Sequence, residues 1–107
     1  MGPRPWRAAA ELDAALSRGD LRYAMALADE VRIERHRPID LKTAARFLPL
    51  IAEASPSEFD TWAIRWLRRW LSETPTPTID QAVDVASGLA ALPVEPEAIE
   101  ALQELVR

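Results

Sequence analysis

The sequence predicts an all-α fold, a compact bundle of about six helices arranged as three successive helical hairpins. Apolar residues recur every three or four positions along most of the chain, which is the spacing of amphipathic helices. No segment alternates apolar and polar residues like a half-buried strand, and no Asn-Gly or Asp-Gly turn indicates a β-hairpin. Short turns containing Gly or Pro separate the helical segments, so consecutive helices should pack in opposite directions.

The length favours one domain, because 107 residues can enclose a hydrophobic core without further support. We expect residues 1–5 to form an N-terminal extension and residues 74–78, with the sequence TPTPT, to form a stiff connector before the last hairpin. The chain has no cysteine, which excludes a disulfide framework and a thiolate metal site. Packing of the helices must therefore hold the domain together.

The first predicted hairpin turns at Gly19. Its first helix should end at this glycine, and Asp20 is well suited to cap the second helix, which extends to about Arg35. Pro38 then prevents the helix from continuing. The apolar positions expected to face the core are Ala9, Leu12, Leu16, Leu21, Ala24, Ala28 and Val31.

A third helix should extend from about Asp40 to Ala54. Pro49 lies inside it, where proline removes one backbone hydrogen bond and clashes with the preceding turn. We therefore expect a kink at Pro49. The positions expected to be buried are Leu41, Ala44, Ala45, Leu48, Ile51 and Ala52.

The segment from Ser55 to Glu73 holds three of the four tryptophans and the strongest helix signals. Ser55 and Glu58 have the spacing of a capping box, and Pro56 occupies the first helical position. Its apolar stripe consists of Phe59, Trp62, Trp66 and Trp70, with Ile64, Leu67 and Leu71 beside it. This arc spans roughly 200°, so the helix should contact more than one neighbour, and Trp66 should be its most buried ring.

The remaining strip of this helix is basic. The tryptophan row is best interpreted as core, and the alternative is a stacking platform or an anchor for a partner. In either case Trp62 or Trp70 should be partly exposed at the edge. The candidate interaction surface therefore consists of Arg65, Arg68, Arg69, Trp62 and Trp70.

The last predicted hairpin begins at a second capping box, formed by Thr78 and Gln81. The fifth helix should end near Leu92 and the sixth should begin at Pro96. Gly88 costs up to about 1 kcal/mol relative to alanine unless a neighbour comes close there. The apolar stripes are Ile79, Ala82, Val83, Ala86, Leu89 and Ala90 in the fifth helix, and Ile99, Leu102, Leu105 and Val106 in the sixth.

The net charge of −4 is unevenly distributed along the chain. Residues 1–72 hold 12 basic and 10 acidic side chains, a balance of +2, whereas residues 73–107 hold one arginine and 7 acidic side chains, a balance of −6. The acidic C-terminal hairpin could fold back on the basic strip of its own molecule or meet the strip of another copy.

An acidic protein is not typical of dedicated nucleic-acid binders, which carry a surplus of positive charge. An accessory nucleic-acid-binding protein with an Arg-rich helical face nevertheless remains the alternative hypothesis. The residues that would serve it are Arg22, Arg32, Arg35, Arg37, Lys42, Arg46 and the Arg65–Arg69 strip.

The residues needed for catalysis or for a cofactor do not come together in the sequence. His36 is the only histidine and lies beside arginines at a helix end, so a capping role is favoured over a metal ligand. Ser55 and Ser57 are better explained as caps than as nucleophiles. Three glycines form no phosphate-binding loop. We therefore expect a non-enzyme with no cofactor and no metal.

We expect a cytoplasmic protein by elimination, because the sequence does not match the targeting signals considered. No apolar run reaches the roughly 18–20 residues of a membrane span, and the N-terminus becomes acidic too early for a secretory signal. Gly2 is followed by Pro3, with Trp6 where a myristoylation site has Ser or Thr. Twelve of the 13 basic residues are arginine, a bias that suggests a GC-rich bacterial genome.

Two segments resemble helical-repeat families. Residues 8–38 resemble a tetratricopeptide unit through Gly19-Asp20 at the turn, Ala24, Ala28 and Pro38, although Ala8 and Leu12 depart from its pattern. Residues 47–70 resemble a HEAT hairpin through Phe47-Leu48-Pro49-Leu50-Ile51 and Ser55-Pro56, although that family lacks the three tryptophans. The resemblance implies a surface that binds a protein or peptide. The resulting hypothesis is a protein-interaction or regulatory module, which includes association with itself.

Overall fold

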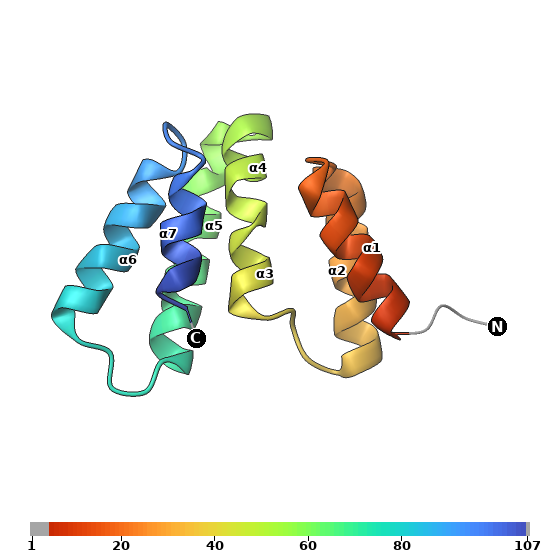
Figure 1. The fold of residues 1–107 in the computed structure, drawn as a ribbon, viewed down its shortest axis with the longest axis horizontal. Helices are drawn as coiled ribbons and strands as arrows, with labels where there is room; N and C mark the ends of the chain where they lie inside the picture. Colours follow the sequence, from red (N-terminus) through yellow and green to blue (C-terminus); the bar gives the residue numbers. More distant parts are fainter. Residues whose placement is uncertain (1–4, 107) are drawn as a thin grey trace.

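Helices joined by short turns make up the described chain, and residues 5–106 contain no strand (Figure 1). The structure is a computed structural model that describes residues 5–106, with side chains from residue 8 onward. The helices are α1 (Pro5–Ser17), α2 (Leu21–Arg35), α3 (Leu41–Ala45), α4 (Phe47–Ala54), α5 (Pro56–Glu73), α6 (Ile79–Ala91) and α7 (Ala98–Glu104). The predicted all-α class is therefore confirmed. Pro5 already belongs to α1, and the rest of the predicted extension lies outside the described residues.

Three helical hairpins lie in a row, as predicted. Helix α1 packs on α2, α4 on α5, and α6 on α7, while α3 joins the row by packing on α5 and α7. The α1–α2 hairpin is at one end and the α6–α7 hairpin at the other (Figure 1). The row measures 48 × 31 × 21 Å, and its radius of gyration of 14.0 Å exceeds the roughly 13 Å typical of this length. The elongated shape leaves the helices at its ends with unpartnered faces.

Glycine and aspartate form the first turn in the predicted way. Gly19 has a φ of +73°, a left-handed conformation that an L side chain rarely adopts. The Asp20 amide donates to the Ala15 carbonyl at 2.9 Å, and the Asp20 carboxylate accepts from the Tyr23 amide at 3.2 Å. These bonds end α1 and start α2 across only three residues, 18–20, which forces the two helices to lie antiparallel.

The predicted third helix is broken at Arg46, one turn before the expected kink at Pro49. A proline ring disturbs the carbonyl four residues earlier, which here belongs to Ala45. The Arg46 amide accordingly donates to the Thr43 carbonyl at 3.1 Å, in a tighter turn. Pro49 therefore sits in the first turn of α4, where its missing N–H is tolerated.

Only one of the two predicted capping boxes forms. The Thr78 amide donates to the Gln81 side-chain oxygen at 2.9 Å, and the Gln81 amide donates to the Thr78 hydroxyl at 3.1 Å. The prediction for Ser55 and Glu58 is wrong, because the Ser55 side chain makes no capping bond. Ser55 ends α4 and begins α5, so its amide donates to Ile51 and its carbonyl accepts from Glu58. Its backbone is therefore held from both sides without the hydroxyl.

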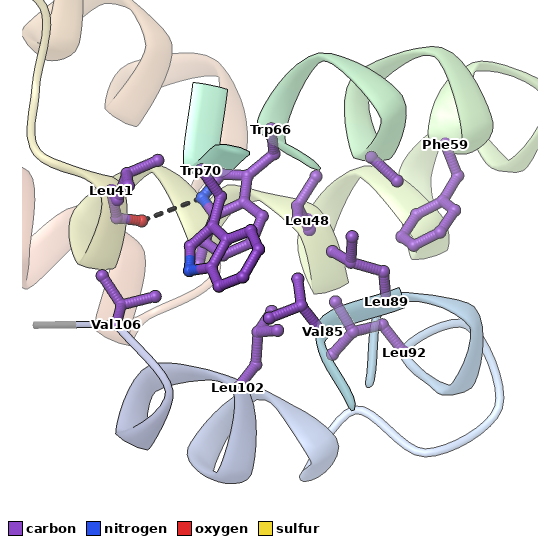
Figure 2. Packing of buried hydrophobic residues seen from close by; sticks show 12 residues of the cluster. Leu41, Leu48, Phe59, Trp66, Trp70, Val85, Leu89, Leu92, Leu102 and Val106 are labelled. Carbon is purple, nitrogen blue, oxygen red and sulfur yellow. Dashed lines mark hydrogen bonds between the residues drawn. The ribbon is translucent and has the colours of Figure 1, made fainter. Parts of the chain in front are cut away.

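Two hydrophobic cores are built on either side of α4. The N-terminal core lies between α1, α2 and α4 and consists of Leu12, Ala15, Leu16, Ala24, Leu27, Phe47 and Ile51. The C-terminal core lies between α3, α5, α6 and α7, with Leu48 added from α4 (Figure 2). Phe47 and Leu48 are adjacent in the sequence yet belong to different cores. Helix α4 is therefore the wall that the two cores share.

Trp70, rather than Trp66, is the most buried tryptophan of α5, so the predicted order is wrong. The exposed fraction is 2% for Trp70 and 5% for Trp66. Figure 2 shows the Trp70 ring between Leu41, Val85 and Val106, since the last hairpin covers this end of α5. The Trp66 indole N–H donates to the Leu41 carbonyl at 2.9 Å, which satisfies the polar atom of a buried ring.

Helix α6 is rotated relative to the predicted stripe. The buried positions are Val85, Leu89 and Leu92, whereas the predicted core residues Ile79 and Val83 are 83% and 56% exposed. The side chains of Ala86 and Ala90, also assigned to that stripe, are exposed as well. Gly88 explains the rotation, because a Cβ there would lie 3.4 Å from Cδ1 of Leu102. Because Gly88 has no side chain, α7 can pack closely against this face of α6. The face that carries Ile79 and Val83 is therefore turned towards solvent.

Candidate interaction surface

A groove between α2 and α5 brings together the exposed tryptophan and two of the predicted arginines. Its volume is ≈ 580 Å³, and we call it the α2–α5 groove. Its apolar lining includes Met25, Ala28, Pro38, Ile39, Phe47, Leu48, Trp62 and Trp66. Its charged lining consists of Asp29, Arg32, Arg65 and Arg69. The result is an apolar floor with cations at the rim.

The groove follows from how the hairpins meet. Both α2 and α5 pack on α4, which lies between them and forms part of the floor. The side of α2 that faces the groove carries Met25, Asp29 and Arg32, with the small side chains of Ala26 and Ala28 at its edges. The residues between α2 and α3, including Pro38 and Ile39, close one end. The volume lies within the roughly 300–1,000 Å³ typical of ligand pockets.

Trp62 is held at the edge of the groove by Arg65. Its exposed fraction is 36%, far above that of the other two tryptophans of α5. The Arg65 guanidinium lies 5.6 Å from the centre of the Trp62 ring, a cation–π contact worth about 0.5–1 kcal/mol at an exposed site. This contact limits the rotation of both side chains, so the aromatic face and the positive charge are presented together.

The charges at the rim are only partly compensated. Arg32 pairs with Asp29 at 2.7 Å, and Arg69 pairs with Glu73, in both cases within one helix. Within residues 5–106, Arg65 forms no ion pair with a carboxylate. The rim therefore retains an uncompensated cation directly beside the exposed tryptophan.

The structure does not bring all five residues of the predicted interaction surface together. Trp62, Arg65 and Arg69 line the groove. Arg68 is exposed but does not line the groove, and it lies about 100° from Arg69 around the helix. Trp70 is wrong as a surface residue, since the α6–α7 hairpin covers it.

The acidic hairpin does not cover the basic strip of its own molecule. It packs on the face of α5 that carries Trp70, and none of the ion pairs found in the described part of the chain joins it to the arginines of α5. Asp80 and Asp84 are exposed on α6 and take part in none of these ion pairs. The strip and the acidic side chains are both available to other molecules.

Sequence reasoning did not identify three apolar residues of the groove lining. These residues are Met25, Ile39 and Phe47, and none of them lies on a predicted apolar stripe. Met25 is 37% exposed and lines the same groove as the exposed Trp62. This combination indicates a binding surface, but it can be recognised only once the fold is known. Arg32 had been considered only for the nucleic-acid alternative.

Three of the other basic residues of that alternative pair with an acidic side chain or share a cavity with acidic side chains. Arg46 is engaged with Asp13 at 2.5 Å and with the Ser17 hydroxyl at 3.0 Å. Arg35 and Arg37 line a second cavity of ≈ 370 Å³ that also contains the acidic residues Asp40 and Glu73. His36 has a left-handed φ of 56° and forms the C-terminal cap of α2.

Searches with family models, among curated proteins and among solved structures found no match to this chain. In the part of the chain that the structure describes, no three His, Cys, Asp or Glu side chains are grouped to hold a metal ion. No helix among the same residues is long and apolar enough to cross a membrane. The function must therefore be argued from the geometry of the surface.

Proposed function

We propose that this chain is a non-enzymatic protein-binding module of a bacterial cytoplasmic system, and that its α2–α5 groove binds an amphipathic helix carrying acidic residues. The observation that carries the proposal is an apolar groove whose rim combines the half-exposed Trp62 with the uncompensated Arg65. Tryptophan and arginine are the residue types most enriched among binding hot spots. Grooves between helices commonly receive the apolar face of a helix.

The chemistry of the groove defines the partner. The floor offers Met25, Ile39 and Phe47 to aliphatic side chains spaced three or four residues apart. Carboxylates on the flank of the same helix would then lie near Arg65 and Arg69, which are one helical turn apart. The apolar contacts would supply most of the affinity, while the charges would select acidic over basic partners.

A pair of synthetic peptides tests the proposal. Both are amphipathic helices with the same leucine stripe, one with glutamates and the other with lysines on its flank. Fluorescence anisotropy of the labelled peptides should show binding of the acidic peptide only. Trp62→Ala and Arg65→Glu should each weaken that binding about tenfold or more. The matched control, Arg68→Glu, removes a charge from the same helix outside the groove and should change the affinity less than about twofold.

Two results would overturn the proposal. One is equal binding of the acidic and the basic peptide, and the other is an equal loss of binding with Arg65→Glu and Arg68→Glu. A labelled single-stranded DNA of matched length provides the comparison with the nucleic-acid alternative. DNA binding that falls steeply with added salt, in the absence of peptide binding, would establish that alternative instead.

A further inference from the structure

The outer face of α6 is an apolar stripe that no described part of its own molecule covers. Ile79, Val83, Ala86 and Ala90 lie at spacings of four, three and four residues, which places them on one line of the helix. Asp80 and Asp84 form a parallel acidic line beside it. Helix α6 occupies the end of the row opposite to α1 and α2 (Figure 1). We call the four apolar residues the α6 stripe.

The α6 stripe and the α2–α5 groove are complementary in three respects. The stripe is aliphatic and the floor of the groove is apolar. The stripe is flanked by carboxylates and the groove by guanidinium groups. The spacing also agrees, because Asp80 and Asp84 are one helical turn apart and so are Arg65 and Arg69.

Resting on the function proposed for the groove, we infer that α6 of a second copy of this chain is a ligand of the α2–α5 groove. Ile79 and Val83 enter the apolar floor, and the alanines that follow let the helix backbone approach its walls. Asp84 then faces Arg65, and Asp80 faces Arg69. The charge asymmetry of the chain, +2 over residues 1–72 and −6 over residues 73–107, favours this orientation over a contact between two α6 stripes.

Helix α6 is already formed in the free chain, which favours its role as a ligand. The capping box of Thr78 and Gln81 fixes its first turn, and Val85, Leu89 and Leu92 anchor its inner face in the C-terminal core. Binding therefore requires little ordering of the backbone, in contrast to a disordered segment that folds as it binds.

The contact joins different surfaces of the two copies, so it is heterologous. A chain of such copies keeps one free groove at one end and one free α6 stripe at the other, so further copies can be added. Such contacts produce open chains or rings rather than a closed twofold dimer. A partner helix that occupies the groove would shorten these chains by competition, which links self-association to the binding of other proteins.

Mixing two variants of the full-length chain tests this arrangement. The groove variant is Trp62→Ala combined with Arg65→Glu, and the stripe variant is Ile79→Lys combined with Val83→Lys. All four positions are exposed, and circular dichroism checks that both variants fold. Sedimentation analysis should show wild-type mass rising continuously with concentration, while each variant alone remains monomeric. An equal mixture of the two variants should form dimers and nothing larger, because each contributes one intact surface.

Matched controls separate this mechanism from nonspecific association. Val94→Lys removes an aliphatic side chain that is 84% exposed outside the stripe, and Arg68→Glu changes a charge outside the groove. Both should associate within about twofold of wild type. Combining Arg65→Glu with Asp84→Arg in one chain should recover at least part of the association lost with Arg65→Glu alone, since the ion pair is restored with its signs exchanged.

The outcomes of these experiments distinguish failure of the self-association inference from failure of the proposed function. Wild type that remains monomeric up to millimolar concentration, yet binds the acidic peptide, overturns the role of a second copy and leaves the proposed function intact. Loss of association in the stripe variant but not in the groove variant would indicate a twofold contact between α6 helices and would overturn the inference. Absence of both self-association and peptide binding overturns both.

Discussion

The two cores of this protein are built from different side chains. Among the described side chains, the N-terminal core combines alanines and leucines with Ile51, and Phe47 from α4 is its only aromatic ring. The C-terminal core contains Phe59, Trp66 and Trp70, together with the hydrogen bond from the Trp66 indole to α3. Large rings bury more apolar area per residue than leucine or alanine. The C-terminal core should therefore supply most of the stability, and the α1–α2 hairpin should be the more easily displaced part.

This difference matters for the groove. One wall is α5, which is anchored in the aromatic core, and the other is α2, which belongs to the weaker core. Helix α4 contributes to both cores and is the main link between them. Adjustment of the groove to a partner should therefore occur by movement of α2 relative to α5.

Trp70→Ala should have the largest effect of the substitutions considered for this comparison. Removing a buried ring leaves a cavity and should lower the free energy of unfolding by about 3–5 kcal/mol, a large part of a small domain's stability. Trp62→Ala is the control at an edge position and should cost less than about 1.5 kcal/mol. Urea unfolding followed by circular dichroism measures both values. Equal costs would contradict the assignment of Trp70 to the core and Trp62 to the surface.

Ile51→Ala tests how tightly α4 couples the two cores. Ile51 is 1% exposed and belongs to the N-terminal core, so the substitution should cost about 2–5 kcal/mol. Hydrogen exchange should show both cores losing protection, although α1 and α2 should lose more. The control Ile33→Ala, at an exposed position of α2, should stay within about 0.5 kcal/mol of wild type. Unchanged protection of α5–α7 would mean that the cores unfold independently.

The sequence was sufficient for the helices and the turns between them. Local signals such as Gly19, Asp20 and the Thr78–Gln81 capping box act within a few residues, so they can be read without the fold. Pro49 was recognised as a disturbance, but its effect on the backbone appears one turn earlier, at Arg46. Boundaries fixed by local chemistry were therefore predictable to within one turn.

The orientation of helices with several apolar faces was not predictable in the same way. Helix α6 has one aliphatic stripe at Ile79 and Val83 and another at Val85 and Leu89, and the choice between them depends on Leu102 packing over Gly88. Burial of Trp70 likewise depends on the last hairpin. The residues proposed from the sequence that line the groove therefore all lie on one helix. The residues of the opposite wall could be identified only from the tertiary structure.

Thr78→Ala should weaken the attachment of the C-terminal hairpin by a smaller amount. The substitution removes the hydroxyl that accepts from the Gln81 amide, and loss of such a cap costs about 1 kcal/mol. Ser55→Ala is the matched control, because the Ser55 side chain makes no capping bond and its loss should cost less than about 0.5 kcal/mol. Thermal unfolding of both variants measures the two losses of stability. Equal losses would contradict the conclusion that the Thr78 side chain caps its helix and the Ser55 side chain does not.

Arg46→Met should produce a still smaller change, confined to the N-terminal side. Arg46 joins α1 to the break between α3 and α4 through Asp13 and Ser17. Because the Asp13 side chain is 70% exposed, solvent screens this pair, and its loss should cost about 0–1 kcal/mol and less at high salt. Hydrogen exchange should become faster in α1 but not in α5. Arg32→Met, whose partner Asp29 lies on the same helix, is the control and should leave α1 unchanged.

The smallest expected effect is a titration within the α1–α2 hairpin. The Tyr23 hydroxyl donates to the Glu11 carboxylate at 3.0 Å, and this hydrogen bond, with the negative charge of Glu11, raises the pKa of Tyr23 above its ordinary value of about 10. Because the folded protein favours the neutral phenol, the contribution of this bond to stability is complete below the unfolded pKa. It is lost as the pH rises through the higher folded pKa.

Tyr23 is the only tyrosine, so the ultraviolet absorbance of the phenolate reports its titration alone. The midpoint should lie above 10 in wild type and fall towards 10 in Glu11→Gln, which keeps an acceptor but removes the charge. Glu30→Gln is the control, because Glu30 acts only through its charge and is the weakest of the causes of the raised pKa. A midpoint that does not respond to Glu11→Gln would show that α1 and α2 are not joined by this bond.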